Sequence, residues 1–123
     1  DTPYRVSTWG YVSADGGTPS VREMKAALCK YGPIAATVNA TEAFTAYAGG
    51  VFDMKEPMAA PDDTNHAIVI AGWDDAKNAY LVKNSWSEAW GEKGYVWIDY
   101  ASNNIGFGAC WVVVTAGNPQ DIR

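Results

Sequence analysis

The sequence has 123 residues, a formal net charge of −5 and a pI of about 4.6, and an acidic chain without a basic run argues against a nucleic-acid role driven by phosphate neutralisation. Its longest apolar stretches, "AIVIAGW" and "ACWVVV", are too short to span a bilayer. With 48% apolar residues, the chain is long enough for one domain, residues 1–123, around one core.

The first half of the chain predicts a strand and then a helix. "YRVSTWGYV", residues 4–12, is β-branched and aromatic, which is typical of a strand. Ser20 and Glu23 have the spacing of a capping box, and apolar residues then recur at helical intervals until Gly32 and Pro33. We therefore expect a helix between Ser20 and Gly32, followed by a strand over 34–38 and a short helical turn within 41–50.

The second half predicts a loop and a run of strands. Residues 51–65 contain prolines and read as a loop. "DDAKN", residues 74–78, is typical of a hairpin turn. Strands are expected over 66–73, 80–83, 94–100 and 110–115. One main helix with these strands predicts an α+β fold built on an antiparallel sheet or a small open barrel.

The hairpin turn brings two polar residues to one end of the sheet. If the strands pair through "DDAKN", a residue near 70 faces one near 82, so His66 lies beside the loop that begins at Asn84. The Asn84 amide oxygen accepts a ring N–H in such a pair, which leaves the other ring nitrogen of His66 free to act as a base. From the residues alone, a structural interpretation is also open: a histidine that merely satisfies its hydrogen bonds, Trp86 and Trp90 capping a core, and an asparagine chosen for its turn angles.

Three longer motifs favour the catalytic interpretation. "TNHAIVIAGW", "YLVKNSWSEAWGEKGYVWI" and "NNIGFGACWVVV" resemble the right-hand, C-terminal domain of papain-like cysteine peptidases. The resemblance continues upstream in "YGPIAATVNA" and "FTAYAGGVFDM" and covers Tyr4 to Thr115. It implies a barrel-like antiparallel sheet with one helix, forming one wall of a cleft opposite a helical left-hand domain.

The resemblance also assigns roles to single residues. His66 matches the catalytic histidine, Asn84 the asparagine that orients it, and Trp86 the tryptophan that shields their hydrogen bond. Trp90 and Gly91 match the structural part of the same motif. Substrate-binding positions, which line or rim the side-chain pocket in the family, are small and uncharged here, as for an apolar substrate side chain: Thr37, Ala40, Asn65 and Ala67. We expect no cofactor and no metal, although a calcium site at the acidic residues near 62 and 74 is an alternative.

Two departures from the family pattern matter. Ser87 stands where the family usually has glycine, which is a strain only if the backbone there needs a positive φ. The family's nucleophilic cysteine, which belongs to the left-hand domain, has no counterpart here. Cys29 and Cys110 are expected to be small buried residues or one disulfide, and both alternatives stay open. The chain is then a C-terminal peptidase domain that supplies base and orienting residue, lacks the N-terminal half with the nucleophile, and is inactive alone.

Other functions remain as alternatives: a pseudoenzyme or protein-binding module that keeps only the right-hand fold, or a structural interaction role. The expected partners are a peptide or protein substrate and the missing N-terminal cysteine domain, with no nucleic acid and no membrane. Trp86 and Trp90 are expected in an exposed patch on the cleft face, which predicts a homo-oligomer through that face, with exchange of residues 1–12. The resemblance favours a secreted or lysosome-like compartment.

Overall fold

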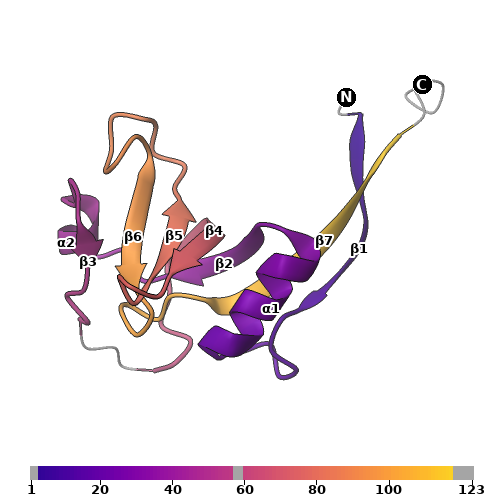
Figure 1. The fold of residues 1–123 in the computed structure, drawn as a ribbon, viewed down its shortest axis with the longest axis horizontal. Helices are drawn as coiled ribbons and strands as arrows, with labels where there is room; N and C mark the ends of the chain where they lie inside the picture. The colour runs from indigo at the N-terminus through magenta and orange to yellow at the C-terminus, as the bar shows by residue number, and fades with distance from the viewer. Residues whose placement is uncertain (1–2, 57–59, 118–123) are drawn as a thin grey trace.

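The computed structural model describes residues 3–56 and 60–117 and shows an α+β fold, as predicted (Figure 1). One sheet of seven strands has the order β1-β7-β2-β4-β5-β6-β3. It is an open sheet whose pairs are antiparallel except β3 with β6. The elements are β1 (Tyr4–Tyr11), α1 (Val21–Tyr31), β2 (Ile34–Val38), α2 (Glu42–Thr45), β3 (Val51–Phe52), β4 (His66–Asp74), β5 (Ala79–Lys83), β6 (Tyr95–Asp99) and β7 (Phe107–Ala116).

Helix α1 begins and ends where its sequence signals predict. The Ser20 hydroxyl accepts from the Glu23 N–H at 3.1 Å, and the Glu23 carboxylate accepts from the Ser20 N–H at 2.9 Å, which completes the capping box. Gly32 has a φ of 80° and ends the helix. Met24 and Leu28 are buried, so this face of α1 covers the sheet.

The core lies against one face of the sheet. Ile34, Ile70, Val82 and Val96 are register partners across four successive strands and are at most 1% exposed. Because side chains alternate along a strand, their neighbours in sequence point to the opposite face, which we call the outer face. The expected register of Ile70 with Val82 is confirmed, and an irregularity follows between Ile70 and Gly72.

One segment differs from the sequence prediction. Val51 and Phe52, expected in a loop, form the short strand β3, which pairs in parallel with β6 at Trp97 and Ile98. Packing explains the difference, since the Phe52 ring contacts Phe44 edge-on at 5.5 Å. The rest of the predicted loop is irregular where it is described, and residues 57–59 lie outside the described residues.

β1 and the end of β7 extend from the body of the sheet as a two-stranded ribbon (Figure 1). On its inner face, Trp111 stacks on Tyr31 of α1 with ring centroids 4.5 Å apart. Cys110 pairs with Ala35, so the outer face of the ribbon continues the outer face of β2. That outer face carries exposed apolar side chains: Tyr4, Val6, Trp9, Tyr11, Val112 and Val114.

In the part of the chain that the structure describes, neither helix has the length and apolar content needed to cross a membrane.

Candidate active site

His66 and Asn84 meet at the end of the β4–β5 hairpin, as the register predicts. The His66 Nε2 atom lies 2.8 Å from the Asn84 Oδ1 atom. The backbone N–H of Ser85 also donates to this Oδ1 atom, at 2.7 Å, which fixes which end of the amide faces the ring. An amide oxygen only accepts, so Nε2 carries the proton and Nδ1 of the neutral ring keeps its lone pair.

Asn84 is buried and held by its backbone as well as by its side chain. The residue is 8% exposed, and its backbone N–H donates to the Gly94 carbonyl at 3.0 Å. Its buried Nδ2 atom has no acceptor among the described residues. The amide oxygen of Asn84 is thus the part of the side chain that is bonded, to the His66 ring and to the Ser85 N–H.

Trp86 covers the histidine. Its ring stacks on the His66 ring with centroids 4.6 Å apart and planes inclined by 27°. Trp90 contacts Trp86 edge-on at 5.2 Å and donates its indole N–H to the Thr45 carbonyl at 2.9 Å. Phe44, fully buried on α2, contacts both indoles. The aromatic group therefore ties the ring of His66 to the core.

The expectation that Trp86 and Trp90 form an exposed patch is wrong. Both indoles are partly buried and pack against the core. They pack on Phe44 of α2, which is the short helical turn expected within 41–50, but no local sequence pattern indicates this contact. Among the described residues, the exposed large apolar side chains lie on the ribbon, with Met54 as the exception.

The structure brings the four expected substrate-binding residues to the strand end beside His66. Thr37 and Ala67 are register partners on the outer face, and the next pair along is Val38 with His66. The Asn65 side chain accepts from the Ala40 N–H at 2.8 Å and donates to the Ala40 carbonyl at 3.2 Å. The positions are thus adjacent, and their role in binding stays a prediction.

Beside these residues is an apolar cavity that the sequence reading missed. It has a volume of about 480 Å³ on the outer face. Strand alternation was the signal that could have found it, because β2 and β4 turn the small or apolar side chains of Ala35, Ala67 and Val69 outward. Its lining residues are Ala35, Ala67, Ile68, Val69, Lys83, Asn84 and Ser85.

Neither cysteine is placed to react with His66. Cys29 is an exposed free thiol on α1. Cys110 is also free, donates to the Gly108 carbonyl at 3.1 Å, and has a pKa raised by burial. It pairs with Ala35, whereas His66 pairs with Val38, so the two lie about 10 Å apart along β2. Of the two alternatives that the sequence left open, the disulfide is absent, and the expectation of a small buried residue is wrong for Cys29, which is exposed, while Cys110 is partly buried.

The acidic residues are not gathered into a site. Asp75 forms an ion pair with Lys25 at 2.7 Å, which lowers the pKa of its carboxyl group. Within residues 3–56 and 60–117, no cluster of histidine, cysteine and acidic side chains could hold a metal ion.

Ser87 has a φ of 73°, so the backbone does need the left-handed region here. We expect Ser87→Gly to raise the free energy of unfolding by about 0.5–1 kcal/mol, because glycine removes the strain of a side chain at this angle. Thermal denaturation measures this as a rise of about 2–5 °C. Ser85→Gly is the matched control, since Ser85 lacks a positive φ. An equal or larger rise for Ser85→Gly would contradict the assignment of strain.

Comparison with known proteins gives a consistent result. A family model described as papain family cysteine protease matches residues 3–116. Pro-cathepsin H of Mus musculus is 36% identical over 89 residues, 71% of this chain and 27% of that protein. Cathepsin Z of Onchocerca volvulus is 36% identical over 98 residues, 76% of this chain and 29% of that protein. The chain therefore spans less than a third of the length of these curated relatives.

Two solved structures share the fold. The bromelain protease from Ananas comosus superposes with a TM-score of 0.69 at 25% identity, covering 88% of this chain and 50% of that one. Digestive procathepsin L 3 from the larval midgut of Tenebrio molitor gives a TM-score of 0.73 at 26% identity, covering 88% of this chain and 35% of that one.

Proposed function

The chain belongs to the papain family of cysteine proteases, and from this premise we propose that it supplies the histidine and asparagine of a peptidase site whose nucleophilic cysteine comes from polypeptide outside these 123 residues. The observation that carries the proposal is the His66–Asn84 hydrogen bond of 2.8 Å beneath Trp86. The reaction is hydrolysis of a peptide bond.

The geometry of His66 supports its role as the proton carrier. With Nε2–H held by Asn84, the Nδ1 lone pair accepts the thiol proton, and the thiolate attacks the peptide carbonyl carbon. The imidazolium then gives that proton to the departing amine. In the second half of the reaction, His66 removes a proton from water, which attacks the acyl-enzyme and releases the free cysteine.

The side chains on the outer face of the sheet indicate that a partner covers it. The apolar cavity beside Ala67 and the exposed side chains of the ribbon lie on this one face. Exposed apolar side chains gathered on one face are typical of an interaction site. We propose that the cysteine-bearing half of the fold occupies it, since the chain matches 50% of the bromelain chain. In its absence, a second copy is the competing occupant.

The neighbouring residues suggest the kind of substrate and the compartment. The outward side chains at Thr37 and Ala67 are small and uncharged, which suits an apolar side chain of a peptide or protein. The relatives are cathepsins and plant thiol proteases, which favours a secreted or lysosome-like compartment.

Measurement of the chain by itself tests the missing nucleophile. We expect no hydrolysis of fluorogenic peptides and no stoichiometric labelling by epoxide inhibitors of cysteine peptidases, because neither thiol lies beside His66. Cys110→Ala is the control. Turnover that disappears in this variant would overturn the proposal. A coding sequence upstream of Asp1 without a cysteine-bearing helical segment would favour a pseudoenzyme or a binding module instead.

A further inference from the structure

The residues that precede His66 in the sequence are hydrogen-bonded to a turn near the C-terminal end of the chain. This turn, Ser102, Asn103 and Asn104, follows β6 and precedes β7. Ser102 is 0% and Asn103 1% exposed. Polar side chains are rarely buried so fully unless hydrogen bonds hold them, so their partners identify what the turn does.

Asn103 uses every polar atom of its amide. Its Nδ2 atom donates to the Glu56 carboxylate at 2.9 Å and to the Asn39 carbonyl at 3.1 Å. Its Oδ1 atom accepts from the Glu56 N–H at 3.2 Å and from the Ser102 hydroxyl at 3.0 Å. The Ser102 oxygen accepts from the Lys55 N–H at 3.0 Å. The turn therefore holds Lys55 and Glu56, about ten residues before His66 in the sequence.

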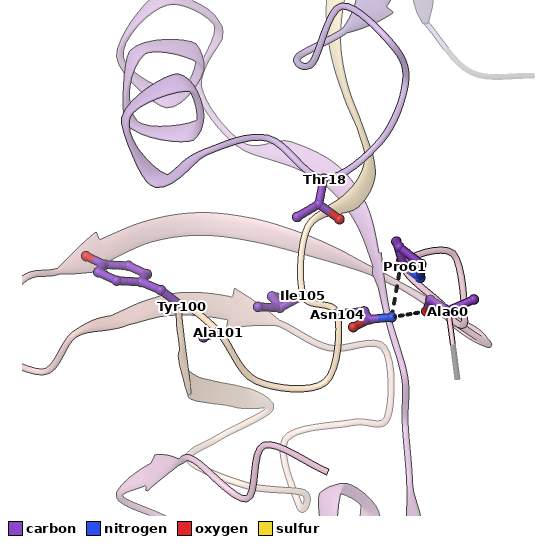
Figure 2. Close-up of a pocket in the computed structure, with 7 residues that line it drawn as sticks. All are labelled: Thr18, Ala60, Pro61, Tyr100, Ala101, Asn104 and Ile105. Carbon is purple, nitrogen blue, oxygen red and sulfur yellow. Dashed lines mark hydrogen bonds between the residues drawn. The ribbon is translucent and has the colours of Figure 1, made fainter. Parts of the chain in front are cut away.

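Asn104 is hydrogen-bonded to residues 60 and 61, a few positions closer to His66 in the sequence. Its Nδ2 atom donates to the Ala60 carbonyl at 2.8 Å and to the Pro61 carbonyl at 3.2 Å, in the wall of a cavity of about 410 Å³ (Figure 2). Asn103 and Asn104 adopt φ values of 51° and 54°, in the left-handed region that asparagine tolerates better than most residues other than glycine. The turn therefore suits its two asparagines, whose side chains are free to bond the neighbouring segments.

The turn is also hydrogen-bonded to the end of β2, which in turn bonds the residue before the histidine. The Asn39 N–H donates to the Asn103 carbonyl at 2.9 Å, and Asn39 directly follows Val38, the register partner of His66. The Asn65 N–H donates to the Val38 carbonyl at 3.2 Å. Both cysteines are free, so hydrogen bonds and not a disulfide link the turn to the end of β2.

We propose that Asn103 and Asn104 are positioning residues for His66: they form a clamp that holds Glu56, Ala60 and Pro61 ahead of the histidine and the end of β2 beside it, and so keep the ring between Asn84 and Trp86. The catalytic consequence rests on the proposed function, whereas the positioning itself belongs to the chain alone.

The test uses the single histidine of the chain, whose ring protons are unambiguous in an NMR spectrum. Trp86 stacks on this ring, so ring-current shifts of the His66 protons report their relative position. Asn103→Gly removes the clamp without straining the backbone. Asn78→Gly is the matched control: Asn78 has a φ of 52°, and its side chain bonds Asp99 away from His66.

We expect the His66 ring resonances to move in folded Asn103→Gly, towards their positions in Trp86→Ala, and to stay unchanged in Asn78→Gly. Unchanged resonances in folded Asn103→Gly, or equal shifts in both variants, would overturn the inference. Should Asn103→Gly not fold, Asn104→Gly, which loses the side-chain hydrogen bonds to the Ala60, Pro61 and Asp63 carbonyls, decides by the same criterion.

Separate results would contradict the positioning role of Asn103 and the proposed peptidase function. In the chain joined to a cysteine-bearing half, the clamp predicts that Asn103→Gly lowers kcat more than it raises KM. If the joined protein is inactive while the resonances move as expected, the proposed function is wrong and the positioning stands.

Discussion

His66→Ala should lower peptide hydrolysis by roughly 10²- to 10⁴-fold in the chain joined to a cysteine-bearing papain-family half, because it removes the base that activates the thiol and the acid that protonates the leaving amine. Asn84→Ala should lower it less, since the imidazole remains and only its orientation by the 2.8 Å hydrogen bond is lost. Initial rates with a fluorogenic peptide, compared at equal concentrations of folded protein, measure both effects.

Asn78→Ala is a matched control for Asn84→Ala, because it removes an asparagine amide at the far end of the same hairpin. The order of the losses is the informative result. Equal losses in the His66 and Asn84 variants would mean that Asn84 does more than orient the ring. A rate unchanged by His66→Ala would contradict its assignment as the proton carrier.

Phe44→Ala should lower the free energy of unfolding by about 3–5 kcal/mol, the range for removing a fully buried aromatic side chain. Small domains are stable by only about 5–15 kcal/mol, so this is a large fraction of the total. The ring contacts Phe52, Trp86 and Trp90, and each of them loses packing when it is removed. Calorimetry should show a fall in Tm of about 10–20 °C.

Phe107→Ala is the matched control, because it makes the same change at a half-buried position. We expect a clearly smaller fall in Tm there. Equal falls would contradict the account in which Phe44 is the buried support of the indoles over His66.

Local signals explain what the sequence predicted well. The capping box at Ser20 and Glu23 and the stop at Gly32 are read within one helix, and the structure has both. The contact of His66 with Asn84 could be predicted from the five-residue turn, because in a short hairpin the facing residues can be counted outward from the turn. The position of Trp86 over the pair was implied by the family resemblance alone.

Contacts between distant segments explain what the sequence could not predict. β3 exists because Val51 meets Trp97, which no local pattern reveals. The burial of Trp90 depends on the carbonyl of Thr45, forty-five residues away. The clamp at Asn103 depends on a left-handed turn that returns to Glu56, and the outer face of the ribbon depends on the pairing of Cys110 with Ala35.

A gain of activity is the most direct test of the paired His66 and Asn84: the chain is joined behind the cysteine-bearing half of bromelain, folding is checked by circular dichroism, and bromelain itself is the reference. We predict hydrolysis of a fluorogenic peptide by the joined protein and epoxide labelling of the introduced cysteine, and neither for the chain alone. A folded joined protein that neither hydrolyses the peptide nor reacts with the epoxide would contradict the claim that His66 and Asn84 form half of a peptidase site.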